Sequence, residues 1–164
     1  MIYRLLLFIP ILLLSGCSYS FTGASISPDS ETFSVTKFPN NAPLVVPTLS
    51  IVFTEKLKDK VLNSTTLDAV SRDGDVRFDG SITQFATGPV NIQGNQTAAQ
   101  SRLTIGVRVV FVDKNDNKKS WEANFSRFAD YPRTQDLSLV QDALTEDILD
   151  QLINDIFLKA FANW

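Results

Sequence analysis

The chain has 164 residues, of which 44% are hydrophobic and 20% are charged. This composition is typical of a folded protein, because disordered chains have fewer hydrophobic residues. The formal net charge is −3, so there is no basic excess that would favour nucleic acid as a partner. The chain has no histidine and one cysteine. These absences exclude a Ser-His-Asp triad, a Cys-His pair and a histidine-based zinc site.

Residues 1–16 have the pattern of a secretory signal peptide. Arg4 precedes an almost unbroken apolar run over 5–14, and small residues follow it. The run is about half as long as a membrane-spanning helix. The segment 14–17, Leu-Ser-Gly-Cys, resembles a bacterial lipobox, which implies cleavage before Cys17 and lipid on its thiol. The alternative is an ordinary signal peptide with an incidental cysteine.

After cleavage, residues 17–164 suffice for one compact domain. Loss of Arg4 leaves 14 basic against 18 acidic side chains, a net charge of about −4. The polar segment 17–30 is interpreted as a lipidated tether, and 31–164 as a single domain. With its one cysteine lipidated, the protein cannot form an internal disulfide. No cofactor is expected apart from the covalent lipid on Cys17.

The first part of the domain predicts a strand, a helix and a short strand. Residues 31–38 alternate apolar and polar side chains, which is typical of a half-buried strand. Thr48 is a suitable N-cap for a helix that continues to about residue 64, with apolar residues on one face. Residues 67–70 then predict a short strand, and 72–75 a turn.

Three further strands are expected over 76–85, 103–111 and 121–129, because apolar residues alternate in each segment. The alternation is cleanest in 103–111. In the first of the three, Phe85 falls out of phase with the earlier apolar positions. This change of phase predicts a β-bulge within 80–84.

The remaining segments are two connections and a long helix. Residues 88–100 are polar and lack periodicity, which predicts a long connecting loop. Residues 113–117 predict a turn. The segment 136–160 carries a wide apolar stripe at helical spacing, with Asp136 or Ser138 as the N-cap.

This order of elements predicts an α+β fold. We expect a two-layer sandwich in which two helices pack on one face of a mixed, mostly antiparallel, four- to five-stranded sheet. The neighbour of the first strand within the sheet stays open.

The predicted turn partly matches a calcium-binding loop. Asp113, Asn115 and Asn117 stand at the first three ligand positions. Lys118 stands where the loop needs glycine, so we interpret the segment as a polar hairpin turn.

Acidic residues on the last helix raise the alternative of a carboxylate-dependent hydrolase. They lie outside the apolar stripe and have no basic or aromatic neighbours at helical spacing, so a solvated helix face is favoured. These residues are Asp142, Glu146, Asp147 and Asp150.

Arg102 and Arg108 lie on the even-numbered face of the clearest strand, with Thr104, Val110 and Val112. This face is expected to point away from the helices. Guanidinium groups beside apolar side chains could bind an anionic amphiphile through its phosphates. The alternative is an ordinary solvent-facing strand.

Several stretches resemble the lipopolysaccharide-assembly lipoprotein family LptE, in its Bacteroidetes-type branch. The resemblance extends over nearly the whole mature chain. The stretches are Cys17-Ser-Tyr-Ser-Phe-Thr-Gly23, Phe38-Pro-Asn-Asn-Ala42, Pro47-Thr-Leu-Ser50, Phe53-Thr-Glu-Lys-Leu57, Asn91-Ile-Gln-Gly-Asn95, Thr97-Ala-Ala99, Arg102-Leu-Thr-Ile105, Phe125-Ser-Arg-Phe-Ala-Asp130 and Ala162-Asn163-Trp164.

The resemblance implies a non-enzymatic lipoprotein with two helices on a mostly four-stranded sheet. It implies a protein that plugs the outer-membrane β-barrel LptD and helps it deliver lipopolysaccharide to the cell surface. Family members bind lipopolysaccharide through basic residues. The best candidate here is Arg102, followed by Arg108, Lys118 and Lys119.

The expected location is the periplasmic face of the outer membrane. Ser18 follows the lipidated cysteine, and no acidic residue that would signal inner-membrane retention or surface export is nearby. An alternative function is that of a periplasm-facing auxiliary lipoprotein in another lipid-transport or secretion system.

Overall fold

The computed structural model describes residues 26–27, 29–44, 46–90 and 99–162. The expected signal peptide, Cys17 and most of the expected tether lie outside these residues, as does most of the expected 88–100 loop.

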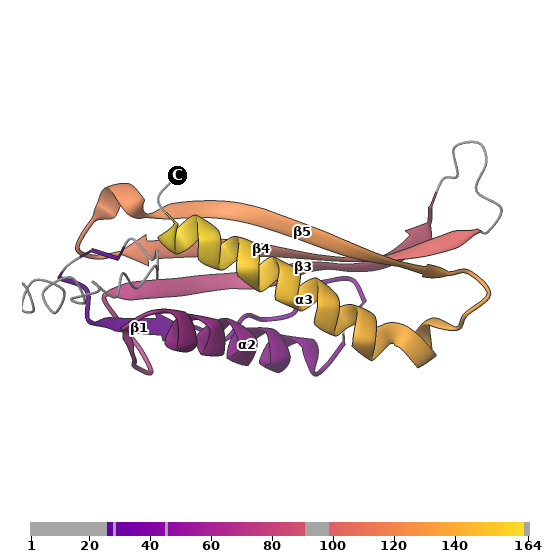
Figure 1. The fold of residues 1–164 in the computed structure, drawn as a ribbon, viewed down its shortest axis with the longest axis horizontal. Coiled ribbons are helices and arrows are strands. Elements are labelled where there is room, and N and C mark those ends of the chain that lie inside the picture. Colours follow the sequence, from indigo (N-terminus) through magenta and orange to yellow (C-terminus); the bar gives the residue numbers. More distant parts are fainter. Residues whose placement is uncertain (1–25, 28, 45, 91–98, 163–164) are drawn as a thin grey trace, which may run out of the picture.

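The described residues form five strands, two α-helices and one short 3₁₀ helix (Figure 1). In chain order they are β1 (Thr32–Val35), α2 (Leu49–Ser64), β2 (Asp68–Ala69), β3 (Val76–Pro89), β4 (Gln100–Asp113), η2 (Asn117–Lys119), β5 (Trp121–Pro132) and α3 (Leu137–Phe161).

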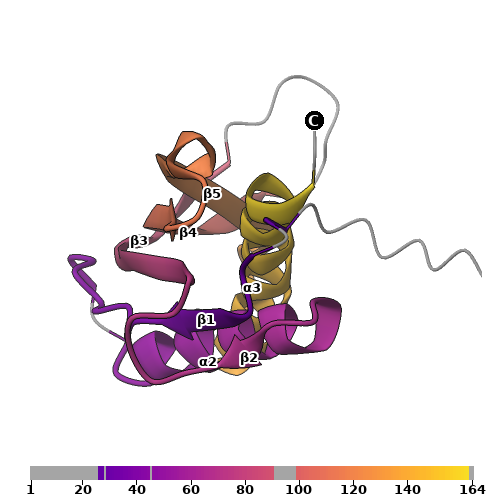
Figure 2. The ribbon, with the colours of Figure 1, turned by 90° about the vertical axis from the view of Figure 1, so that its left-hand side faces the viewer.

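The strands form one mixed sheet in the order β2-β1-β3-β4-β5. β1 lies parallel to both of its neighbours, and β4 is antiparallel to both β3 and β5. Viewed from its end, the sheet curves around α3, and α2 lies beside β1 and β2 (Figure 2). The predicted α+β fold is therefore confirmed, and the open question about the first strand is answered.

The long β3–β4 hairpin dominates the sheet. The register shifts between Ile82 and Gln84, which confirms the predicted bulge. Both strands are longer than predicted, since β3 continues to Pro89 and β4 begins at Gln100. The prediction of a loop over 88–100 was therefore wrong at both ends. These end residues lack apolar alternation, and pairing with the opposite strand holds them instead.

The core lies between the sheet and the two helices. The odd-numbered residues of β4 from Leu103 to Phe111 are all buried. The ring of Phe111 packs edge-to-face on Phe78, with ring centres 5.1 Å apart, and on Phe161 of α3 at 5.9 Å. Burial of each such side chain contributes about 1.5–3 kcal/mol to stability. The closing helix is thereby fixed to the hairpin.

The helix starts match the predicted caps in position. Thr48 is the N-cap of α2, although its side chain makes no capping hydrogen bond. Asp136 is the N-cap of α3 and accepts a hydrogen bond from the backbone N–H of Ser138, which decides between the two predicted caps.

Among the described residues, no helix has both the length and the apolar character needed to cross a membrane.

Gly80 marks a place where strand β4 and the segment after β1 come close to β3. A β-carbon at Gly80 would lie 2.1 Å from the Arg108 carbonyl oxygen and 2.6 Å from a ring carbon of Phe38. We predict that Gly80→Ala lowers the free energy of unfolding by about 1–3 kcal/mol, measured by urea denaturation. Gly88→Ala on the same strand is the control, because nothing lies within 4 Å of its β-carbon. Equal stability of the two variants would contradict the prediction.

Candidate functional site

The face of β3, β4 and β5 opposite the helices, called the outer sheet face below, carries the predicted arginines. Residues directly opposite one another in neighbouring strands share a face, so the register places the members of this surface together. They are Arg77, Asp79, Arg102, Thr104, Arg108, Val110, Glu122, Phe128 and Asp130. As predicted, this face points away from the helices.

Arg102 makes the most elaborate contacts on the outer sheet face. Its Nε and Nη2 groups donate to the two carboxylate oxygens of Asp130 at 2.7 and 2.9 Å. Its guanidinium carbon lies 3.5 Å from the centre of the Phe128 ring. Hydrogen bonds from Arg102 hold the pKa of Asp130 below its ordinary value. The guanidinium is thus oriented by a carboxylate on one edge and an aromatic ring on one face.

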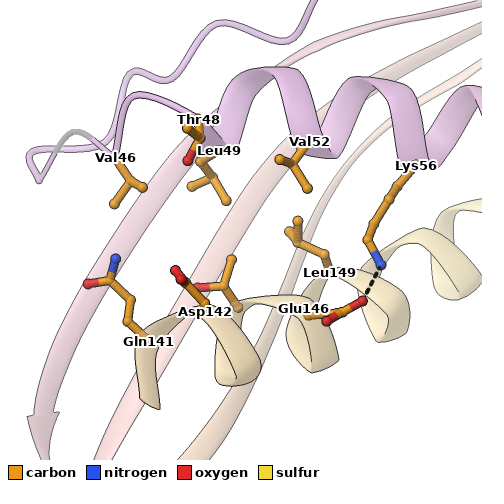
Figure 3. Close-up of a pocket in the computed structure, with 10 residues that line it drawn as sticks. Val46, Thr48, Leu49, Val52, Lys56, Gln141, Asp142, Glu146 and Leu149 are labelled. Carbon is orange, nitrogen blue, oxygen red and sulfur yellow. Dashed lines mark ion pairs between the residues drawn. The ribbon is translucent and has the colours of Figure 1, made fainter. Parts of the chain in front are cut away.

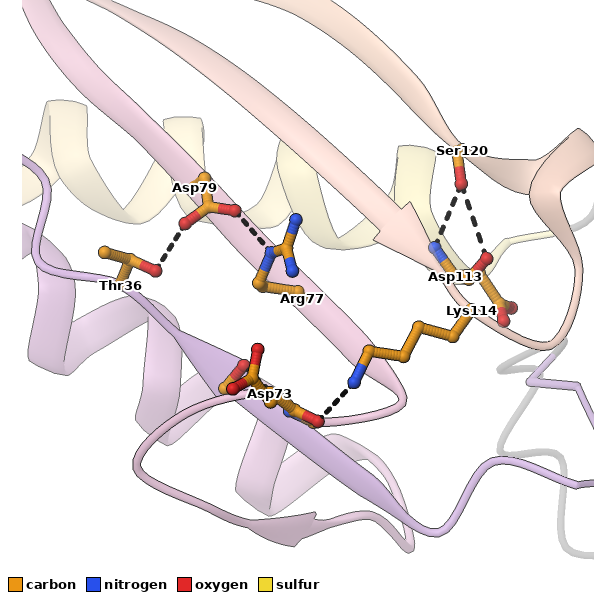
Figure 4. A network of polar contacts seen from close by, with 9 residues as sticks. Thr36, Asp73, Arg77, Asp79, Asp113, Lys114 and Ser120 are labelled. Carbon is orange, nitrogen blue, oxygen red and sulfur yellow. Dashed lines mark hydrogen bonds and ion pairs between the residues drawn. The ribbon is translucent and has the colours of Figure 1, made fainter.

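The other two arginines of this face are also paired with carboxylates. Arg108 Nε donates to Glu122 at 2.7 Å, and this contact lowers the pKa of Glu122. Arg77 Nε donates to Asp79 at 2.6 Å (Figure 4). Three arginines therefore meet three carboxylates, and the face has no net charge from these pairs.

The four predicted basic residues do not form one cluster. Arg102 and Arg108 share the outer sheet face of β4 at a spacing of about 20 Å along the strand. Lys118 and Lys119 lie in η2, beyond the other end of β4. This end is about 35 Å along the strand from Arg102. The structure thus offers three separate basic positions, at Arg102, at Arg108 and at Lys118 with Lys119.

The end of the sheet near η2 holds the last part of the expected tether. The Ser27 hydroxyl donates to a carboxylate oxygen of Asp113 at 2.8 Å, and Lys119 Nζ lies 3.4 Å from the same hydroxyl. The Asn115 side chain donates to the carbonyl of Asp29 and to Ser30. The 113–117 turn, which partly matched a calcium loop, therefore holds the end of the expected tether against the sheet.

Within the described ranges, no cluster of three or more acidic, histidine or cysteine side chains could hold a metal.

An open groove separates the first halves of α2 and α3 (Figure 3). Its volume is about 370 Å³, and Leu49, Val52 and Leu149 supply apolar lining. Lys56 reaches across it to Glu146 at 3.5 Å and to Asp150 at 2.6 Å.

The four acidic residues of α3 that raised the hydrolase alternative are all exposed. They lie on the surface of the helix, as the solvated-face interpretation predicts. Asp142 and Glu146 line the open groove between the helices, where Lys56 pairs with Glu146. A carboxylate-dependent hydrolase needs two carboxyl groups that converge in an enclosed pocket. The exposed carboxylates of α3 therefore give the hydrolase alternative no support.

A family model described as LptE, lipopolysaccharide-assembly, matches residues 30–160. The chain belongs to the LptE family. Membership implies a role in lipopolysaccharide assembly, and the family is non-catalytic. Comparison with curated proteins gives no match.

Solved structures that are similar to this chain come from several bacteria. A hypothetical protein from Chlamydia trachomatis has a TM-score of 0.52 at 8% identity, over 80% of this chain and 98% of that one. A protein from Xanthomonas campestris has a TM-score of 0.50 at 13% identity, over 83% and 91% of the two chains. A minor lipoprotein from Acinetobacter baumannii has a TM-score of 0.47 at 14% identity, over 81% of this chain and 97% of that one. At these identities the first two show the fold alone.

The sequence identified Arg102 and Arg108 but not the residues that hold them. Asp130, Glu122 and Phe128 occupy even-numbered positions of β5, on the face opposite the odd-numbered apolar residues that pack against the core. The alternation of side chains along β5 could therefore have placed these three residues on the same face as the arginines. The exact partners depend on the β4–β5 register, which the connecting turn determines.

The Arg102–Asp130 pair makes a prediction about pH. Asp130 has a lowered pKa in the folded state, so its stabilising effect is present above the ordinary value of 3.8 and is lost as the pH falls through the lowered pKa. We predict that the free energy of unfolding falls as the pH drops from about 4.5 to about 2, and falls less in Arg102→Gln. Urea denaturation across this pH range measures the free energy of unfolding of the unmodified protein and of the variant. The other titrating groups are common to the two proteins, so identical pH dependence would contradict the prediction.

Proposed function

We propose that this protein is a lipoprotein component of the lipopolysaccharide translocon. In this proposal, lipid on Cys17 anchors it to the periplasmic face of the outer membrane. The domain plugs a β-barrel of the LptD type and assists delivery of lipopolysaccharide to the cell surface. The observation that carries the proposal is the LptE family match over residues 30–160.

Two features of the chain support this assignment. The lipobox-like segment ending in Cys17 provides an attachment for lipid ahead of the domain. The stretches quoted above resemble the Bacteroidetes-type branch, so we assign the chain to that branch within this proposal.

The outer sheet face is the proposed contact for lipopolysaccharide. Arg102 and Arg108 project there with exposed fractions of 36% and 52% for their side chains. Guanidinium groups bind phosphate through two parallel hydrogen bonds, and Val110 and Phe128 add apolar surface nearby. Lys118 and Lys119, at the other end of the sheet, form a second and weaker contact in this proposal.

The partnership is tested by isolating the lipidated protein from outer membranes. One large β-barrel should copurify with it, because the proposed plug lies inside that barrel. Cys17→Ala is the control for the anchor, since it removes the lipid while leaving the domain unchanged. Recovery of soluble partners alone would contradict the proposal.

Depletion in cells separates this function from the alternative lipid-transport role. We expect loss of lipopolysaccharide from the cell surface, measured by surface labelling of intact cells. Unchanged surface lipopolysaccharide together with defective phospholipid distribution would instead support an auxiliary role in another system.

The arginine contact is tested by replacing Arg102 and Arg108 with glutamine. Glutamine removes both charges without placing a new carboxylate beside Asp130 or Glu122. We predict about five- to thirtyfold weaker binding to lipopolysaccharide, since each lost charge contact is worth about 0.5–1 kcal/mol. Binding is measured by flotation with vesicles that contain lipopolysaccharide.

A matched double variant controls for the change in net charge. Lys58→Gln with Lys60→Gln removes two part-exposed positive charges from α2, in the helix layer. Its binding should equal that of the unmodified protein. Equal binding by both double variants would reject the outer sheet face as the lipopolysaccharide contact.

A further inference from the structure

The anion site on Arg102 is already occupied by a side chain of the protein itself. Arg102 presents its Nε–Nη2 edge, the arrangement that binds a phosphate through two hydrogen bonds. The two oxygens of Asp130 accept from this edge at 2.7 and 2.9 Å. Phe128 covers one face of the guanidinium at 3.5 Å. An incoming anion therefore meets an oriented arginine whose best binding edge is filled.

Solvent reaches this cluster, so a ligand can do so too. The side chains of Arg102 and Asp130 are 36% and 27% exposed, and Phe128 is 48% exposed. An ion pair at such a partly exposed position contributes about 1 kcal/mol at most, so a ligand of higher charge can replace one of its partners. An anionic ligand can thus replace the Asp130 carboxylate on the Arg102 guanidinium.

We propose that Asp130 is an internal competitor that makes the Arg102 site selective for phosphate monoesters. The inference rests on the proposed function, because it takes Arg102 as part of the lipopolysaccharide contact. A phosphate monoester carries about −1.5 to −2 charges at pH 7 and can outcompete a carboxylate of charge −1. A phosphodiester carries one negative charge and gains no such electrostatic advantage over Asp130.

This competition explains how an arginine surface can avoid ordinary membrane phospholipids. Phospholipids with phosphodiester headgroups surround an anchored protein in large excess. A freely available arginine would bind any of them. Pairing with Asp130 raises the charge that a ligand needs, so the pair favours an amphiphile with terminal phosphates.

The same arrangement recurs on the outer sheet face. Arg108 is held by Glu122 of β5 at 2.7 Å, as Arg102 is held by Asp130 of β5. Both carboxylates come from the strand next to the arginines. Asp130 is the stronger competitor, because it accepts two hydrogen bonds from the Nε–Nη2 edge of Arg102 and Glu122 accepts one from Arg108.

Asp130→Asn tests the inference with the full-length protein. Binding is measured with vesicles of a zwitterionic lipid to which either lipopolysaccharide or the anionic phosphodiester lipid phosphatidylglycerol is added. We expect the variant to bind phosphatidylglycerol vesicles about two- to fivefold more tightly, with a smaller gain for lipopolysaccharide. Selectivity between the two lipids should therefore decrease. Unchanged or weaker binding of both lipids would overturn the inference, because it would make Asp130 a support for Arg102.

Asp155→Asn is the matched control. Arg127 donates to Asp155 at 2.6 and 2.9 Å, the same two-bond geometry, but this pair joins β5 to α3. The variant changes the net charge equally and should leave lipid binding unchanged. An equal gain in this variant would assign the effect to net charge and overturn the proposal.

Arg102→Gln separates the proposed lipopolysaccharide contact at Arg102 from the proposed competition by Asp130. If Arg102→Gln does not weaken binding to lipopolysaccharide, the arginine contact and this inference both fail. If it weakens binding but Asp130→Asn brings no gain, only the inference fails. In the double variant the gain should disappear, because it acts through Arg102.

Two further measurements complete the test. Asp130→Ser provides a second uncharged variant if the asparagine protein unfolds, and a thermal melt compares the folding of both. Inorganic phosphate distinguishes a free anion from a lipid headgroup. Tighter binding of inorganic phosphate by Asp130→Asn without any gain on vesicles would overturn the lipid assignment.

Discussion

The alternation of side chains along β4 is the constraint on which the structure depends. Each successive side chain of a strand points to the opposite face, so the run from Leu103 to Phe111 buries its odd-numbered members against α3 and the hairpin core. The same geometry leaves Arg102 and Arg108 on the outer sheet face. A shift of one residue would bury the arginines and expose the core, which the packing of the aromatic rings opposes. Core and candidate site are therefore two consequences of one register.

Much of this arrangement could be predicted from the sequence, because apolar periodicity reports burial directly. The clean alternation of 103–111 predicted both faces of β4, and the phase change at Phe85 predicted the bulge. The ends of β3 and β4 could not be predicted, since residues such as Pro89 and Gln100 are held by pairing across the hairpin and not by burial. The partners of the arginines were also missed. Asp130 reaches Arg102 only in the register that the β4–β5 turn imposes.

The outer sheet face combines positive groups with their own counter-ions. Such a surface has little net attraction for anions at long range, because opposite charges lie within a few ångströms of one another. Binding then depends on a ligand that offers more charge or better geometry than the internal carboxylates. In the proposed function, this would make the surface a selective contact within an anionic membrane. The proposal thereby assigns part of the family's role in lipopolysaccharide assembly to particular residues of this chain.

In the proposed function, lipopolysaccharide contacts the protein on the outer sheet face. Crosslinking in living cells tests it most directly. A photoreactive amino acid at Thr104 lies on this face between β3 and β5, and one at the exposed Asp147 of α3 lies on the helix layer. We predict crosslinks to lipopolysaccharide from position 104 and none from position 147. Crosslinks from position 147 alone, or equal crosslinks from both, would contradict the claim.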